Sequence, residues 1–258
     1  MNDDDDEMPV LSDSTLIALQ EFYAERAAHE EKLNRLQNEA ESKTTGTALE
    51  DSNNLFHHGL NMDIFTENWQ YSQFWYDEET ARKLATAVLG NASKGETIAM
   101  ISAPSAYVMA KKLLIESGRP QTSWPKIILL EFDRRFKIFK DEFVFYDFKN
   151  PMQLPSELKG SINHIICDPP FLSDDCQTKV AISVKWLSKS WEIMPESRAE
   201  ESRLVICTGE RMEKTIQKLY QKRGIFRTNF EPTHTKQQLS NEFLCFANFE
   251  CTQWLWKE

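Results

Sequence analysis

The sequence predicts an α/β fold in which a doubly wound sheet of seven mostly parallel strands follows an N-terminal helical extension. Three observations lead to this fold class. Short apolar, β-favouring runs alternate with helical segments from residue 97 onward. Several of these runs end in a serine or an acidic residue, as expected at a ligand-binding sheet edge. One run stops abruptly at two prolines, which cannot continue a strand.

The acidic charge of the chain lies in its first sixty residues. Residues 1–60 hold 14 acids and 4 bases, whereas residues 61–258 hold 26 of each, so the net charge of −10 belongs to the extension. We divide the chain accordingly: residues 1–60 are an acidic tail, an amphipathic helix and a linker, and residues 61–258 are the main domain. The helix is expected from Ser12 or Asp13 to about Ser42. It either packs on its own domain, which we favour, or contacts a basic protein partner.

Composition restricts the location and the partners. There is no run of about 18 apolar residues that could span a membrane. The acidic start is unlike a signal or transit peptide, and the five cysteines form no Cys-x-x-Cys pair, so we expect a cytoplasmic protein with reduced thiols and no metal site. The main domain has no block of Lys and Arg, which disfavours nucleic acid as a partner. No oligomeric state is predicted.

The elements of the main domain follow in order. Asp77 is expected to cap a helix that ends at Gly90, after an aromatic cluster in which Trp75 and Tyr76 are the candidates for a pocket rim. Helices are also expected from Pro104 to Gly118, over about 176–191 and over about 210–222. The seven predicted strands are 98–101, 127–130, 143–146, 162–167, 204–207, 225–230 and 243–249.

Four consecutive strands end in Ser102, Glu131, Asp147 and Asp168. In a doubly wound sheet these ends converge on one crevice, so the pattern predicts a cofactor pocket. The acid that closes the second strand holds ribose hydroxyls, which indicates Glu131 with Asp133 as the alternative. Asp147 can bind an adenine amino group. The competing interpretation is that one or two of these acids are helix caps.

Asp168, Pro169, Pro170 and Phe171 suit the methylation of an amine. Methyl transfer needs a neutral nitrogen with its lone pair aimed at the donor. Asp168 can accept one N–H, the carbonyl of Pro169 can accept another, and Phe171 can hold the substrate group against its ring. The alternative is a plain Pro-Pro turn after a core strand.

With these residues in place, the chain resembles a family: class I, seven-strand (Rossmann-like) S-adenosylmethionine-dependent methyltransferases with an Asp-Pro-Pro-Phe site. Within that class it is most similar to the elongation factor 1-alpha lysine methyltransferases, formerly grouped with putative N6-adenine DNA methyltransferases. The matching stretches are residues 11–16, 18–23, 68–76, 130–136, 143–148, 168–173 and 241–243.

The resemblance implies cytoplasmic methylation of a lysine on elongation factor 1-alpha, with S-adenosylmethionine as the methyl donor. It places the substrate amine at residues 168–171, and Trp75 and Tyr76 are the candidates for substrate binding. The cofactor side is expected to be lined by these residues: Ser102, Ala103, Pro104, Ser105, Glu131, Asp133, Asp147 and Phe148. One departure is the first loop, residues 101–105, which lacks the glycines usual in the wider class.

Two other functions stay open. An N6-adenine methyltransferase could use the same four residues on a flipped base, with Phe171 stacking on it. A non-catalytic binding module on an inherited methyltransferase fold is the other alternative, and the glycine-free loop motivates it.

Overall fold

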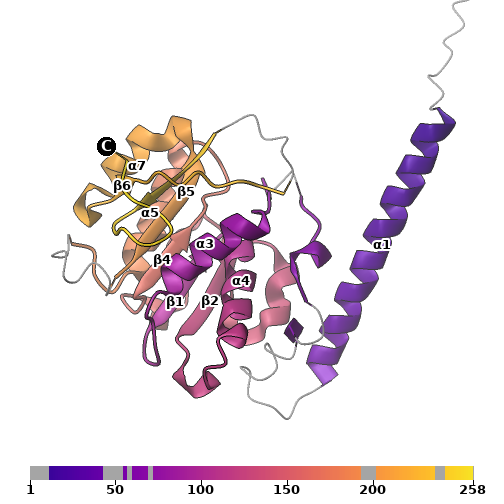
Figure 1. Ribbon diagram of the computed structural model, residues 1–258, viewed down its shortest axis with the longest axis horizontal. Helices are drawn as coiled ribbons and strands as arrows, with labels where there is room; N and C mark the ends of the chain where they lie inside the picture. Colours follow the sequence, from indigo (N-terminus) through magenta and orange to yellow (C-terminus); the bar gives the residue numbers. More distant parts are fainter. Residues whose placement is uncertain are drawn as a thin grey trace, which may run out of the picture.

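A computed structural model describes residues 12–42, 55–56, 60–68, 72–192, 202–235 and 242–257. Within these ranges, seven strands form one sheet in the order β3-β2-β1-β4-β5-β7-β6 (Figure 1). All neighbours are parallel except β7, which runs antiparallel to both β5 and β6. The bounds are β1 Thr97–Ile101, β2 Lys126–Glu131, β3 Phe143–Phe145, β4 His164–Cys167, β5 Leu204–Gly209, β6 Phe226–Arg227 and β7 Phe243–Ala247. The predicted doubly wound sheet of seven mostly parallel strands is confirmed.

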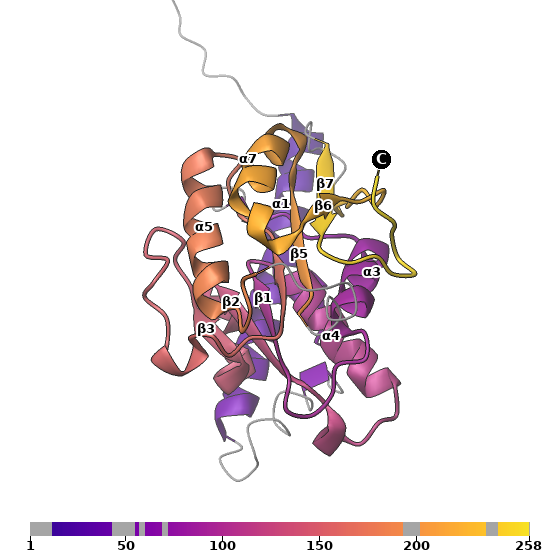
Figure 2. The same cartoon turned by 90° about the vertical axis from the view of Figure 1, so that its left-hand side faces the viewer.

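Helices cover both faces of this sheet (Figure 2). Helices α3 (Glu78–Leu89) and α4 (Pro104–Glu116) pack on one face, and α5 (Asp174–Leu187) and α7 (Glu213–Leu219) pack on the other. The strands alternate between the two resulting cores: Ile98 of β1 faces the first and its neighbour Ala99 faces the second. Because successive side chains of a strand point to opposite faces of the sheet, one apolar run contributes residues to both cores.

Short 3₁₀ helices complete the main domain. They are η1 Met62–Ile64, η3 Gln121–Ser123, η4 Arg134–Glu142, η5 Ser156–Leu158, η6 Glu210–Met212 and η7 Gln221–Arg223. The helix expected over 210–222 is thus α7 flanked by η6 and η7, and η4 was not predicted. The predicted strand 225–230 shortens to Phe226–Arg227. Beyond it, the Thr228 N–H still donates to the carbonyl of Cys245 in β7, while Thr228 also forms a single bridge with Trp256 and the Asn229 N–H donates to the carbonyl of Leu255.

The helix caps follow the sequence closely. Asp77 accepts a hydrogen bond from the backbone N–H of Thr80 at 2.7 Å and caps α3, as predicted. Helix α5 begins two residues before the predicted start because Ser173 caps it through the backbone N–H of Cys176. Pro104 is the first residue of α4, where its missing N–H has no intrahelical partner to lose.

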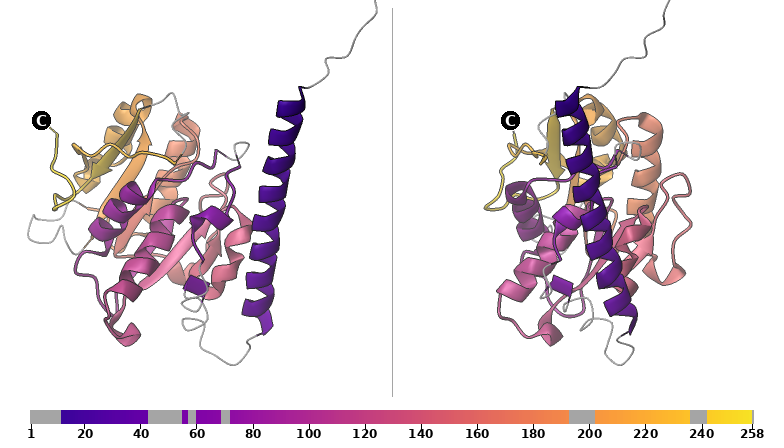
Figure 3. Two further views of the ribbon diagram at one scale, coloured as in Figure 1. Left: turned by 45° about the vertical axis from the view of Figure 1, so that its right-hand side comes forward. Right: turned by 90° about the vertical axis from the view of Figure 1, so that its right-hand side faces the viewer.

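Helix α1 (Asp13–Ser42) has the predicted bounds and runs beside the main domain as a separate arm (Figure 3). Leu33 and Leu36, near its C-terminal end, are buried in the core, whereas Leu16, Ile17 and Tyr23 are exposed. Packing on its own domain therefore holds for only part of the helix. The domain boundary at residue 60 stays a prediction, and the tail and most of the predicted linker lie outside the described residues.

A buried ion pair joins α4 to η4. The ammonium of Lys111 lies 2.8 Å from a carboxylate oxygen of Glu142, and the Tyr107 hydroxyl donates to the other oxygen at 2.5 Å. All three side chains are buried. Because each charged or polar group here has a partner, the cost of removing them from water is offset.

Candidate active site

A cavity of about 640 Å³ opens at the carboxyl ends of the central strands. The register places these ends level with one another: Ile101 of β1 pairs with Leu130 of β2 and with Cys167 of β4. The residues that follow each strand therefore meet at one edge of the sheet. Ser102, Glu131, Asp147 and Asp168 all line the cavity, which confirms that the four strand ends converge.

Glu131 is the buried acid on the cofactor side. One of its carboxylate oxygens accepts the backbone N–H groups of Phe132 at 2.9 Å and Asp133 at 3.1 Å. Burial raises the pKa of Glu131 to about 7, against the opposing effect of these hydrogen bonds. Two backbone donors fix the carboxylate at the end of β2, where it lines the cavity.

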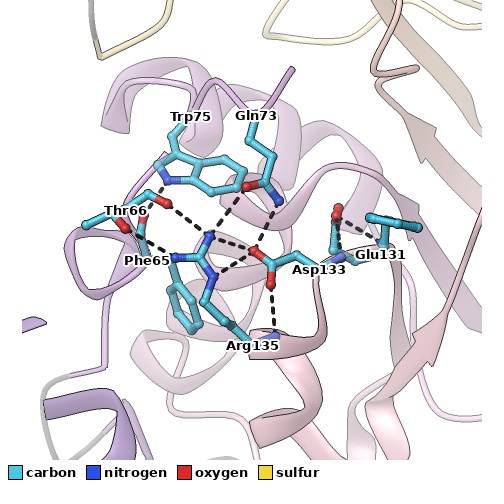
Figure 4. Close-up of polar contacts among 8 residues, drawn as sticks. Phe65, Thr66, Gln73, Trp75, Glu131, Asp133 and Arg135 are labelled. Carbon is cyan, nitrogen blue, oxygen red and sulfur yellow. Dashed lines mark hydrogen bonds and ion pairs between the residues drawn. The ribbon is translucent and has the colours of Figure 1, made fainter. Parts of the chain in front are cut away.

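Asp133 does not line the cavity. It caps η4 through the backbone N–H of Arg135 and forms an ion pair with that guanidinium at 2.6 Å (Figure 4). Its carboxylate also accepts from Gln73, and Arg135 continues the network to Thr66. Asp133 is therefore a helix cap, and of the two acids predicted for the ribose only Glu131 is among the residues that line the cavity. Its contact with the ribose stays a prediction.

The glycine-free loop after β1 reaches a glycine-like conformation through a serine. Ser102 has φ of +53°, in the left-handed region that costs an ordinary residue about 1–3 kcal/mol. Its backbone N–H donates to the carbonyl of Leu130 at 2.9 Å, which holds the turn against the neighbouring strand. Ala103, Pro104 and Ser105 are buried at the start of α4, and they lie behind the cavity wall instead of lining it.

Asp147 and Phe148 follow β3 and both line the cavity. The Asp147 carboxylate accepts from the backbone N–H of Lys149 at 2.9 Å and from the amide of Asn150 at 3.1 Å, so it also stabilises its own turn. Phe148 packs against Phe171 with ring centroids 5.6 Å apart, which joins the cofactor side to the substrate side.

Asp168, Pro169, Pro170 and Phe171 all line the cavity. Burial raises the pKa of Asp168 to about 7; the nearby Tyr76 hydroxyl lowers it and the charge of Glu131 raises it further. The Asp168 backbone N–H donates to the carbonyl of Ile101 at 3.0 Å, so the residue continues the sheet. No hydrogen bond to the Pro169 carbonyl occurs among the described residues, which leaves that acceptor to a ligand.

Two polar residues hold the loop that follows. The Gln177 amide of α5 donates to the carbonyl of Phe171 and to the Thr208 hydroxyl, both at 3.1 Å. Arg211 donates to the carbonyl of Leu172 at 2.6 Å. Gly209, at the end of β5, lies under Leu172: a Cβ at this position would meet a Leu172 methyl at 2.6 Å. The loop is therefore fixed from α5, β5 and η6.

The two predicted substrate aromatics are separated by the structure. Trp75 lines the cavity, and its indole N–H donates to the carbonyl of Phe65. Tyr76 lies behind the wall. Its buried hydroxyl has no hydrogen-bond partner within normal geometry among the residues that the structure describes, and it is close enough to Asp168 and Cys207 to interact electrostatically. Tyr76 therefore affects the site indirectly, through its electrostatic interaction with Asp168.

Sequence reasoning assigned no role to several residues that line the cavity: Ser72, Gln73, Phe74, Phe132, Tyr146, Lys149, Leu172, Arg211, His234 and Phe243. Position directly after a strand is a signal that could have found Phe132 and Tyr146. His234 carries no such signal. It lies in no helix or strand of the described structure and forms only a single β-bridge, with Tyr76.

The sheet order, the antiparallel β7 and a cavity that joins a buried acid after β2 to Asp-Pro-Pro-Phe after β4 define a class I methyltransferase. Among the described residues, no helix has both the length and the apolar character needed to cross a membrane.

Comparison with known proteins gives the particular family. Residues 67–251 match the family model described as "Probable N6-adenine methyltransferase", and the chain belongs to that family. Protein-lysine N-methyltransferase EFM5 of Saccharomyces cerevisiae is 39% identical over 254 residues, covering 95% of this chain and 93% of its own. EEF1A lysine methyltransferase 1 of Gallus gallus is 37% identical over 250 residues (96% and 98%), and that of Homo sapiens is 35% identical over 248 residues (96% and 95%).

Similarity to solved structures is more distant. A branched-chain polyamine synthase from Thermus thermophilus covers 70% of this chain and 59% of its own, with 12% identity and a TM-score of 0.48. The curated relatives are named as protein-lysine N-methyltransferases, so the enzyme class expected from the sequence is confirmed and a non-catalytic module is not supported.

Proposed function

We propose that this protein transfers a methyl group from S-adenosylmethionine to a lysine of translation elongation factor 1-alpha. The observation that carries the proposal is that Asp168 and Phe171 share one cavity with Glu131. The names of the relatives support the choice of substrate.

The cofactor side suits S-adenosylmethionine. Glu131 is buried, fixed by two backbone N–H groups and placed at the end of β2, where its other oxygen can accept ribose hydroxyls. Phe132, Asp147 and Phe148 line the same side and can enclose an adenine ring. Ser102 gives the first loop the backbone conformation that a glycine would otherwise provide. When bound, S-adenosylmethionine supplies an electrophilic methyl group on a sulfonium centre.

The substrate side suits a lysine amine. A free lysine has a pKa of about 10.4, so it arrives as an ammonium and must lose a proton before it can act as a nucleophile. The pKa of Asp168, about 7, lies closer to that of lysine than the pKa of an ordinary aspartate does. Asp168 can thus accept the proton or pass it to water, while it and the Pro169 carbonyl orient the neutral nitrogen.

Transfer to the exocyclic amine of adenine is the second candidate, because the family description names it. Asp168 and Phe171 could hold a flipped base in the same way. The balanced charge of residues 61–258 argues against it, since nucleic-acid binding rests largely on contacts between cations and phosphate.

Transfer of labelled methyl tests the proposal. Wild type and Asp168→Ala would be incubated with labelled S-adenosylmethionine and with elongation factor 1-alpha, duplex DNA or single-stranded nucleic acid. We expect label on the elongation factor, lost in Asp168→Ala, while calorimetry shows that the variant still binds S-adenosylmethionine. Label on nucleic acid alone, with affinity that falls steeply with salt, would overturn the proposal in favour of the second candidate.

A cytoplasmic location is also part of the proposal. Its support is that all five cysteines are free, as expected for a reducing compartment. Fluorescence microscopy of a tagged chain would test it.

A further inference from the structure

The wall of the cavity on the substrate side includes a segment whose role the proposed reaction does not explain. Residues 233–235 run antiparallel to residues 75–77. The Asp77 N–H donates to the carbonyl of Thr233 at 3.1 Å, and the Thr235 N–H donates to the carbonyl of Trp75 at 2.9 Å. Tyr76 and His234 are directly paired across this bridge. The backbone therefore fixes where His234 enters the cavity wall.

The side chain of Thr233 strengthens this pairing. Its hydroxyl donates to the Asp77 carboxylate and lies 3.0 Å from the Thr80 hydroxyl, and its N–H donates to that hydroxyl at 3.1 Å. The segment is thus tied to the first turn of α3. A wall anchored in this way presents a fixed surface to a ligand and loses little entropy on binding.

Aromatic rings surround the His234 imidazole. Its centroid lies 4.5 Å from that of Phe243 in an edge-on arrangement, 4.9 Å from Tyr76 and 6.5 Å from Phe74. Phe74, His234 and Phe243 line the cavity together, although they come from distant parts of the chain. Tyr76 connects this group to Asp168, because its hydroxyl lies close enough to lower the pKa of that carboxyl.

The imidazole is held in its neutral form. Burial lowers the pKa of His234 to about 4, and the charges of Glu67 and Asp77 oppose the shift without reversing it. No hydrogen bond to the ring occurs among the described side chains. At neutral pH the wall therefore adds aromatic faces to the cavity and no positive charge, which is the environment that favours a cation.

We propose that Phe74, His234 and Phe243 form the binding wall for the side chain of the lysine that is methylated. This inference rests on the proposed function. The three rings contact the methylene stem and attract the ammonium as it approaches Asp168, and the uncharged imidazole avoids repelling it. His234 and Phe243 then determine that a long cationic side chain enters, and the cofactor side does not depend on them.

Substitution of His234 separates this role from a merely structural one. His234→Phe keeps a flat ring of similar size, whereas His234→Arg places a permanent cation in the wall. Thr235→Arg is the matched control, because it puts the same charge on the next residue, which is exposed outside the cavity. Steady-state methyl transfer to elongation factor 1-alpha would give KM and kcat, and calorimetry would give the Kd for S-adenosylmethionine.

We expect His234→Arg to raise KM for the protein substrate about tenfold or more with an unchanged Kd for S-adenosylmethionine, since a like charge opposes the ammonium. His234→Phe keeps a ring face and should raise KM much less than His234→Arg does, and Thr235→Arg should stay within about threefold of wild type. An unchanged KM in a folded His234→Arg protein would overturn the inference.

A second variant covers the case in which His234→Arg does not fold. Phe243→Leu keeps an apolar side chain and removes the ring, and we expect a loss of about five- to tenfold in kcat/KM, mainly through KM. A loss confined to kcat, or no loss, would contradict the binding role. If wild type itself transfers no methyl to the elongation factor, the proposed function fails instead, so the two failures are distinguishable.

Discussion

Replacing Asp168 by Asn should stabilise the ligand-free protein, although it removes the residue that orients the substrate amine. The pKa of Asp168 rises from an ordinary value of 3.8 to about 7 in the folded state. A carboxyl with a raised folded-state pKa binds its proton more tightly when folded, so it lowers stability increasingly as the pH rises from 3.8 through 7. Asn keeps the shape of the side chain and cannot ionise.

The size of the effect follows from the shift. About three pKa units at 1.36 kcal/mol each give an upper bound of ~4 kcal/mol at pH 8, and partial access of water to the cavity reduces this to about 2–4 kcal/mol. For a domain of this size, that is a rise in Tm of roughly 5–15 °C. The difference between the two proteins should fall to roughly half at pH 5.5, where the wild-type carboxyl is protonated when folded.

Thermal unfolding of both proteins at pH 8 and pH 5.5, without S-adenosylmethionine, measures this difference. Asp175→Asn is the control, since Asp175 is an exposed acid paired with Lys179 and its loss should cost at most about 1 kcal/mol. The reasoning is refuted if Asp168→Asn is no more stable than wild type at pH 8, or if its advantage does not depend on pH.

Three further predictions concern the cofactor side, the buried ion pair and the loop after β4. Because the pKa of Glu131 is about 7, the wild-type Kd for S-adenosylmethionine should rise about tenfold when the pH falls from 8 to 6. Glu131→Gln should bind S-adenosylmethionine about tenfold more weakly than wild type at pH 8, and its Kd should change much less with pH. Calorimetry measures both effects. Lys111→Met leaves Glu142 buried without its cation and should lower the free energy of unfolding in urea by about 3–5 kcal/mol, with part of the loss recovered by adding Glu142→Gln. Gly209→Ala brings a methyl group within 2.6 Å of Leu172, so the loop after β4 must move. We expect kcat to fall at least tenfold with little change in the Kd for S-adenosylmethionine. An unchanged kcat would show that the position of this loop is not critical.

The site residues that could be predicted from the sequence are those that directly follow a predicted strand. Glu131, Asp147 and Asp168 were each found because a residue directly after a buried parallel strand must lie at the carboxyl edge of the sheet. That argument is local and needs only the strand boundaries. The argument fails at Asp133, two residues beyond β2, because its carboxylate caps a helix. Position in the sequence alone does not distinguish Asp133 from Glu131.

The rest depends on contacts between distant segments. His234 lines the cavity because residues 233–235 pair with residues 75–77, and no periodic pattern records that pairing. Ser102 adopts a positive φ that its residue type disfavours, since the turn is held by Leu130 of the neighbouring strand. Tertiary structure overrides local preference at both positions, and both lie at the site.

The position of β7 has a consequence for how the protein is made. This strand, Phe243–Ala247, inserts between β5 and β6, and Phe243 itself forms part of the cavity wall. On the ribosome, the sheet can grow from β1 to β5 while the last strand is still inside the exit tunnel, which leaves the edge of β5 unpaired. Neither the sheet nor the substrate wall is complete until β7 emerges. A nascent chain therefore lacks its complete site until residues 243–247 have left the tunnel, and a protein shortened before Phe243 would expose a sheet edge prone to aggregation.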